Sequence, residues 1–261
     1  MGQHLSVDKQ LVTGFQIHSN CVTNDNSHSI TSNLLLLPGL MCDAVFWAPL
    51  LQSINGQVID YADADSIKAM AQAVLAAAPP VFSIAGHSMG GRVALEVVRL
   101  APARVNKLIL MDTGYLPRAQ GEKGELEKTG RMALVDIAKM QGVRAMCAEW
   151  VKAMVHPDRL TDAALIESIV AMFERKTAAH FARQQHALLS RPDASPVLTA
   201  LKIPCMMLCG AQDSWANVAQ HAAMQALAPH ASLSVIEDAG HMVLMERPAP
   251  TIAVIRQFLE S

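Results

Sequence analysis

Continuous apolar runs alternate with amphipathic segments over most of the chain after residue 30. The runs at 34–37, 81–85 and 205–209 have the length of strands, and residues 105–111, which end in four apolar residues, predict another strand. Apolar runs of this kind are typical of strands buried on both faces of a parallel sheet. Segments with apolar residues at helical spacing lie between or after them, at 43–54, 66–77, 92–100 and 218–227. This alternation predicts an α/β protein with a mostly parallel sheet flanked by helices.

Shorter signals complete the expected core. Residues 58–61 and 233–236 predict short strands, and residues 248–259 predict a closing helix. Asp65 is expected to cap the helix at 66–77, which ends at a pair of prolines. Residues 10–17 are expected to form a short edge strand.

The strand–helix alternation stops between residues 118 and 191, where only helical patterns remain. They cover 124–141, 143–154, 161–173 and 177–189. We therefore expect an α/β core built from residues 1–116 and 196–261. An all-helical cap, residues 117–195, is inserted after the strand that ends near Asp112.

Composition excludes several classes of protein. The 261 residues are 51% hydrophobic and carry a net charge of −2, with no long basic run, so we expect no nucleic-acid partner. The apolar runs are too short to span a membrane, and no signal peptide opens the chain. Five scattered cysteines suit a reducing compartment, so we expect the protein to be cytoplasmic. We expect a monomer or a homodimer.

Residues 86–90 read Gly-His-Ser-Met-Gly and stand between an apolar strand and a helical segment. A Gly-x-Ser-x-Gly turn in this context holds a serine in a strained conformation with its hydroxyl exposed above the sheet. Ser88 is therefore the expected nucleophile. His87, the variable residue of the motif, is expected to point away from it.

A serine nucleophile needs a base to take its proton and an acid to orient that base. His241 and Asp213 each follow a strand, and they occur in the chain order Ser, Asp, His that this type of turn accompanies. Two other acids compete for the orienting role. Asp112 ends the strand at 105–111, and Asp238 is closer to His241 but is better explained as a turn former. The sequence favours Asp213 over Asp112 without excluding Asp112.

Two backbone N–H groups should bind the oxyanion that forms on the substrate. One belongs to Met89, directly after the nucleophile. The other is expected in the Pro-Gly loop after the first strand, where we choose Leu40. Gly39 would allow the close backbone approach that this loop requires.

The chain resembles the α/β-hydrolase superfamily in four motifs. These are Leu-Leu-Leu-Leu-Pro-Gly at 34–39, Gly-His-Ser-Met-Gly-Gly at 86–91, Cys-Gly-Ala-Gln-Asp at 209–213, and Gly-His-Met at 240–242. It looks like the small bacterial esterases, enol-lactonases and haloperoxidase-like members with a helical cap. The resemblance implies the α/β-hydrolase fold, a triad of Ser88, His241 and Asp213, and a cap at 117–195. The chain departs from the family pattern at Pro38, where histidine is frequent, and at 61–65, where a glycine-rich turn is usual.

We therefore expect a carboxylesterase-like serine hydrolase that cleaves small-molecule carboxylic esters through an acyl-enzyme. Carbon–carbon bond hydrolysis and cofactor-free oxygenase or perhydrolase chemistry use the same triad and remain alternatives. A non-catalytic ligand-binding protein is a third. Met41, Trp150, Trp215 and Met242 are the candidate substrate-binding residues. No motif for a metal or a cofactor is present, so we expect neither.

Overall fold

A parallel sheet of six strands forms the centre of the molecule. The computed structural model describes Met1 and residues 33–261, so the strand expected at 10–17 lies outside the described residues. The strand order is β2-β1-β3-β4-β5-β6, and every neighbouring pair is parallel. The strands are β1 (Leu34–Leu37), β2 (Gln57–Val58), β3 (Phe82–His87), β4 (Val105–Met111), β5 (Cys205–Gly210) and β6 (Ser232–Ile236).

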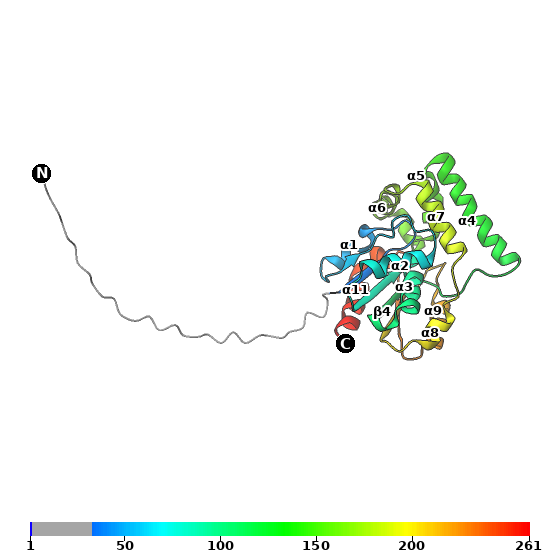
Figure 1. The fold of residues 1–261 in the computed structure, drawn as a ribbon. Helices are drawn as coiled ribbons and strands as arrows, with labels where there is room; N and C mark the ends of the chain where they lie inside the picture. Colours follow the sequence, from blue (N-terminus) through cyan, green and yellow to red (C-terminus); the bar gives the residue numbers. More distant parts are fainter. Residues whose placement is uncertain (2–32) are drawn as a thin grey trace.

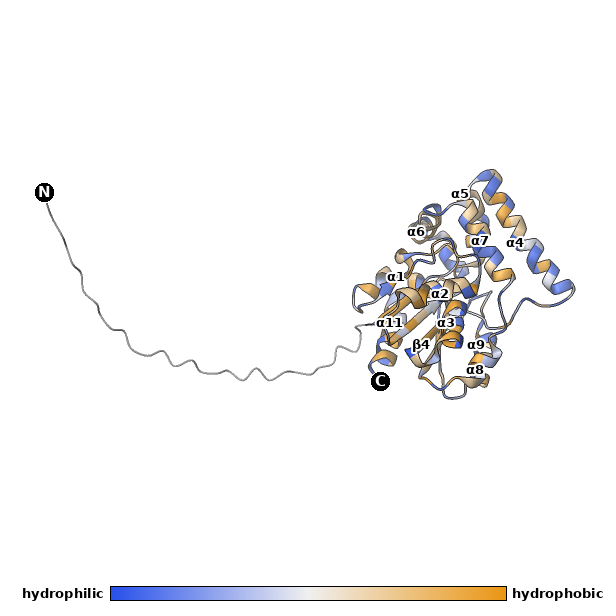
Figure 2. Cartoon of the chain, in the orientation of Figure 1, coloured by the Kyte–Doolittle hydropathy of each residue, from blue (hydrophilic) through white to orange (hydrophobic). Residues whose placement is uncertain are grey.

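The apolar runs form the sheet because both of its faces are covered. All residues of β1 and β5 are buried, and the strands appear as orange ribbons inside the molecule in Figure 2. Helices flank the sheet in two groups. One group is α1 (Ala44–Leu51), α10 (Val243–Glu246) and α11 (Pro248–Glu260); the other is α2 (Ile67–Ala77), α3 (Met89–Leu100), α8 (Ser195–Ala200) and α9 (Val218–Leu227).

Four further helices stand between β4 and β5 in the sequence and lie together at the top of Figure 1. We refer to them as the helical insertion. They are α4 (Glu122–Gln141), α5 (Val143–Trp150), α6 (Ala163–Glu174) and α7 (Ala178–Leu189), with 3₁₀ turns at Val151–Ala153 and Pro157–Thr161. A third 3₁₀ turn, Pro102–Arg104, precedes β4. The insertion therefore sits at the end of the sheet where the strands finish.

Three local expectations were wrong. The second strand covers only Gln57–Val58 and not residues 58–61, because it pairs with β1 only at Leu35 and Leu36. The helix after it is capped by Ser66, whose side chain accepts a hydrogen bond from Ala69 N, and not by Asp65. The segment expected as one helix at 143–154 is α-helical only to Trp150 and continues as a 3₁₀ turn. Among the described residues, no helix is both long and apolar enough to cross a bilayer.

Candidate active site

Ser88 lies in the tight turn between β3 and α3. Its backbone has φ 52° and ψ −115°, a conformation that non-glycine residues rarely adopt. The turn depends on the glycines around it, because a Cβ on Gly86 would lie 2.5 Å from the carbonyl oxygen of Gly90. A Cβ on Gly90 would overlap the carbonyl oxygen of Leu37. The strand and helix can therefore approach closely enough to project Ser88 beyond the carboxyl end of the sheet.

Ser88, His241 and Asp213 form one chain of hydrogen bonds. His241 Nε2 lies 2.8 Å from Ser88 Oγ, and His241 Nδ1 lies 2.8 Å from Asp213 Oδ2. The three side chains come from the loops after β3, β6 and β5, which end at the same edge of the sheet. With a proton on Nδ1 donated to Asp213, the imidazole presents Nε2 as an acceptor to the serine hydroxyl.

The environment keeps Asp213 ionised. Burial raises its pKa, but the neighbouring His241 and the N–H groups of Trp215 and Ala216 outweigh burial and lower the pKa to about 2. Both N–H groups donate to Asp213 Oδ1, while Oδ2 accepts from the imidazole. One carboxylate thus caps a local turn and orients His241 at the same time.

Asp112, the rival acid, is in a different state. Its side chain is fully buried, Oδ1 accepts from Gly210 N at 3.0 Å, and Oδ2 has no hydrogen-bond partner among the described residues. Burial, reinforced by the charge of Asp213, raises the pKa of Asp112 well above its usual value. Its backbone is also left-handed, with φ 45°. The raised pKa favours the neutral form of Asp112, and the structure gives its carboxyl no hydrogen bond to His241.

His87 does not point away from the site, contrary to the expectation from the motif. Its Nε2 lies 2.8 Å from the carbonyl oxygen of His241, and its ring stacks on Phe46 with centroids 3.9 Å apart. Burial lowers the pKa of His87 to about 3, so the imidazole is neutral and donates from Nε2 to the carbonyl. His87 thereby braces the loop that carries His241.

The loop after β1 runs beside the serine turn. Leu40 and Met89 both line the cavity above Ser88, as expected for the two oxyanion donors. Leu40 N makes no hydrogen bond to another described residue, and an N–H in the first turn of a helix, such as that of Met89, has no intrahelical partner. A Cβ on Gly39 would lie 2.7 Å from His87 Nδ1, so only glycine allows this approach.

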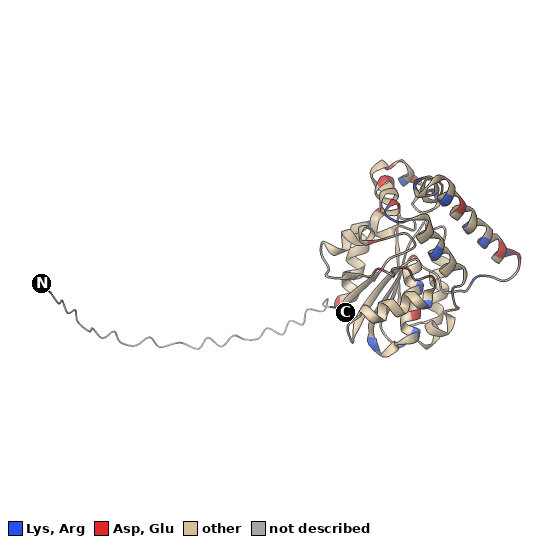
Figure 3. Ribbon diagram, turned by 45° about the horizontal axis from the view of Figure 1, so that its top comes forward, with Lys and Arg blue, Asp and Glu red and all other residues tan. Residues whose placement is uncertain are grey.

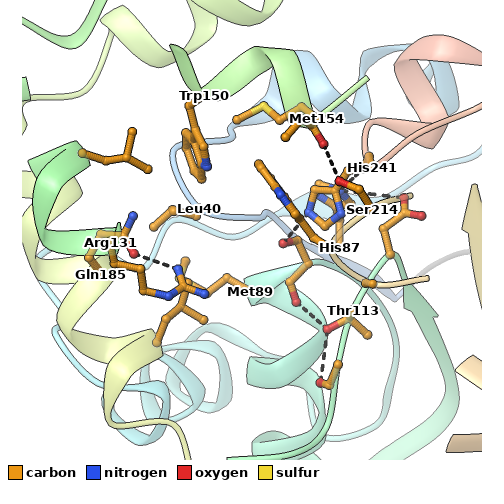
Figure 4. Close-up of a pocket in the computed structure, with 18 of the residues that line it drawn as sticks. Leu40, His87, Met89, Thr113, Arg131, Trp150, Met154, Gln185, Ser214 and His241 are labelled. Atoms are coloured by element: carbon orange, nitrogen blue, oxygen red, sulfur yellow. Dashed lines mark hydrogen bonds and ion pairs between the residues drawn. The ribbon is translucent and has the colours of Figure 1, made fainter. Parts of the chain in front are cut away.

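A cavity of about 700 Å³ opens above Ser88 and His241, between the sheet edge and the helical insertion. Trp150, Trp215 and Met242 line it, as the sequence suggested. Figure 4 shows Trp150 and Leu40 facing one another across this space. Met41 does not line it: its side chain is fully buried, and its N–H is held by Gln184 Oε1 of α7 at 2.8 Å.

Three arginines that the sequence analysis did not single out also line the cavity. Arg131 and Arg191 share the carboxylate of Glu127, and Arg131 also bonds Gln185 (Figure 4). Arg92 donates to the carbonyl of Leu116 and forms no ion pair with any described residue. Burial and the two neighbouring arginines lower the pKa of Arg92. A guanidinium nonetheless keeps its charge in proteins. The three arginines face two glutamates in the cavity wall, Glu127 and Glu149, so one positive charge is in excess.

A signal for Arg92 was present in the sequence. It follows Ser88 by four residues at the start of a helix, and residues four apart lie on the same helical face. Arg131 and Arg191 had no comparable signal, because they come from distant parts of the chain. The described residues contain no cluster of three or more His, Cys, Asp or Glu that could hold a metal ion.

Comparisons with known proteins concern the family and the fold. A model of the Alpha/beta hydrolase family matches residues 34–254. The 2-succinyl-6-hydroxy-2,4-cyclohexadiene-1-carboxylate synthase of Klebsiella pneumoniae is 29% identical over 182 residues, which are 69% of each chain. The pimeloyl-[acyl-carrier protein] methyl ester esterase of Aliivibrio salmonicida is 22% identical over 88% of this chain and 92% of its own.

Among solved structures, a malate-bound thermophilic esterase from Thermogutta terrifontis superimposes with a TM-score of 0.76. It is 24% identical, and the match covers 87% of this chain and 89% of the esterase. At that level of identity the likeness shows a common fold.

Proposed function

Because the chain belongs to the alpha/beta hydrolase family, we propose that it is a serine hydrolase of small-molecule carboxylic esters. The observation that carries the proposal is the unbroken hydrogen-bond chain from Asp213 through His241 to Ser88, at 2.8 Å for each step. It stands at the floor of a cavity large enough for a small ligand.

In the proposed reaction, Ser88 Oγ attacks the ester carbonyl carbon while His241 Nε2 takes the hydroxyl proton. The N–H groups of Leu40 and Met89 donate hydrogen bonds to the oxyanion of the tetrahedral intermediate. Its collapse breaks the bond to the leaving alcohol, which receives the proton from His241. Water, deprotonated by His241, then attacks the acyl-enzyme and releases the carboxylic acid and Ser88. Asp213 holds the imidazole in one tautomer throughout and stabilises the imidazolium.

The positive charge of the cavity supports an anionic substrate. Arg92 lies one helical turn from Ser88 and has no carboxylate partner among the described residues. A charged group in such a site is normally paired, and a guanidinium pairs well with a carboxylate. We therefore propose that the substrate carries a free carboxylate in addition to its ester group. The relative from Klebsiella pneumoniae is named for a carboxylate product, in keeping with such a substrate.

A second candidate is carbon–carbon bond chemistry on the same three residues. The similarity to a protein named a cyclohexadiene-carboxylate synthase favours it. An Asp-oriented histidine next to a serine can remove a proton from a substrate carbon as well as from a hydroxyl group. Both candidates need Ser88 and His241, so assays with esters and with carbon acids distinguish them.

The test is turnover of p-nitrophenyl acetate and butyrate by the full chain and its Ser88→Ala variant. Replacement of the nucleophile should lower kcat at least about 10³-fold, since the nucleophile and its base act as a unit. Ser53→Ala, which changes a serine at the end of α1, is the matched control and should keep kcat. Wild-type turnover by Ser88→Ala would contradict the proposal.

A further inference from the structure

Glu246, at the end of α10, is a carboxylate that the proposed reaction does not use. Its side chain is buried, with 4% of the residue exposed. Three backbone N–H groups surround it. Gly240 N and Met242 N donate to Oε1 at 3.0 Å and 3.1 Å, and His156 N donates to Oε2 at 2.7 Å. Burial raises the pKa of Glu246, and the three N–H groups oppose that rise by favouring the ionised form.

The donors belong to two segments that are far apart in the sequence. Gly240 and Met242 are the neighbours of His241 on either side. His156 belongs to the segment 153–156 of the helical insertion, which we call the strap. One carboxylate therefore joins the loop of the general base to the insertion.

Other contacts hold the strap at the same place. His241 N donates to the carbonyl of Met154 at 2.6 Å, and Ser214 Oγ donates to the carbonyl of Ala153 at 3.0 Å. Figure 4 shows Met154 and Ser214 beside His241. A Cβ on Gly240 would lie 2.7 Å from His156 N, so the strap packs directly on the loop. The strap also carries Ala153 and Met154 into the cavity wall.

We propose that Glu246 is a positioning residue for this reaction. It clamps the strap to the His241 loop. The imidazole therefore stays within hydrogen-bond reach of Ser88, and the part of the cavity wall that the strap forms stays at a fixed distance from His241 and Ser88. The inference rests on the proposed function. A carboxylate suits this role because its two oxygens can accept from both segments at once, which no neutral side chain of the same size does.

The test uses Glu246→Gln in the full chain. Glutamine has one acceptor oxygen, so its NH₂ group must face at least one of the three N–H groups and break that side of the clamp. We expect kcat for p-nitrophenyl butyrate to fall at least about 10-fold, since misplacement of a catalytic group by 1 Å can cost on the order of 100-fold. We expect KM to change less than twofold. Asp238→Asn is the matched control: it removes an exposed carboxylate from the same loop, paired with Arg247, and should keep kcat.

A double-mutant cycle with His241→Ala separates positioning from general stabilisation. If Glu246 acts through His241, Glu246→Gln should have no further effect on the residual turnover of His241→Ala. An equal loss in both backgrounds would overturn the inference, as would a folded Glu246→Gln variant with wild-type kcat. Wild-type turnover by Ser88→Ala would instead overturn the proposed function, so the two failures are distinguishable.

Hydrogen exchange of the wild-type protein provides a readout that needs no folded variant. The amides of His156, Gly240 and Met242 should exchange slowly and as a group, because each is bonded to a buried carboxylate. Exchange as fast as that of exposed loop amides would overturn the clamp.

Discussion

At the scale of single residues, two buried aspartates at the same edge of the sheet have pKa values shifted in opposite directions. Asp213 is ionised because His241 and two N–H groups favour its charge, whereas burial and the charge of Asp213 raise the pKa of Asp112. Both aspartates follow strands of the sheet, so their position at its edge did not tell their roles apart in the sequence. Their hydrogen-bond partners do distinguish them, and those partners come from loops that only the folded chain brings together.

The first prediction distinguishes the two acids. Asp213→Asn should lower kcat by about 10⁴-fold, because an amide at this position favours the wrong tautomer of the histidine. Asp112→Asn should change kcat less than about threefold, since asparagine resembles a neutral acid, accepts from Gly210 N and tolerates positive φ. Steady-state kinetics on p-nitrophenyl butyrate measures both. The reverse ranking would identify Asp112 as the orienting acid.

The second prediction concerns the pH dependence of stability. The pKa of Asp112 is raised in the folded state, so as pH rises above about 4 the unfolded chain loses this proton while the folded protein keeps it. Asp112 therefore lowers the free energy of unfolding at neutral pH, and Asp112→Asn removes this destabilisation. Urea unfolding of both proteins at pH 4, 5.5 and 7 should show the variant gaining relative to the wild type as pH rises. A gain by the wild type instead would mean that Asp112 is ionised when folded.

At the scale of elements, the main strands could be predicted from the sequence, whereas the contacts made by the loops could not. The apolar runs predicted β1, β3, β4 and β5 because a strand buried on both faces needs such a run. The approach of His87 to His241 and the strap contact with Gly240 depend on tertiary packing that no local pattern encodes. The same holds for Gln184, which reaches from α7 to hold the backbone of Met41. Motif spacing therefore located the strand tips, but not the residues that brace them.

The third prediction tests the packing that supports the serine turn. Gly90→Ala should lower the free energy of unfolding by about 3 kcal/mol, because its Cβ would collide with the backbone of β1, which cannot move freely within the sheet. Gly130→Ala is the control, since a Cβ there meets nothing within 4 Å on the exposed helix α4. It should add about 0.5–1 kcal/mol through helix propensity. Equal effects in urea unfolding would contradict the packing argument.

At the scale of the whole molecule, the helical insertion and the α/β core share one cavity. The core contributes Ser88, His241 and Arg92 to its wall; the insertion contributes Trp150 and Arg131. Figure 3 shows blue and red positions interspersed along the helices of the insertion, so its positive contribution to the cavity comes from specific side chains and not from an overall basic surface. The limits of 117–195 for a cap remain a prediction.

The fourth prediction concerns substrate charge. The monoanion of monomethyl succinate should have a kcat/KM about 10-fold above that of methyl butyrate, which has a methyl group where the succinate ester has a carboxylate, because a charge-assisted bond to Arg92 contributes about 1.5–3 kcal/mol. Arg92→Gln should remove the preference, whereas Arg256→Gln on the exposed side of α11 should keep it. A neutral ester preferred by the wild type would contradict the anionic substrate class.

Covalent labelling of Ser88 tests the central claim most directly. We predict that a fluorophosphonate adds once to the folded protein, that peptide mapping places the adduct on Ser88, and that His241→Ala slows labelling by at least about 10³-fold because the hydroxyl loses its base. An intact protein that gains no adduct at Ser88, or that labels equally fast without His241, would contradict this account of the site.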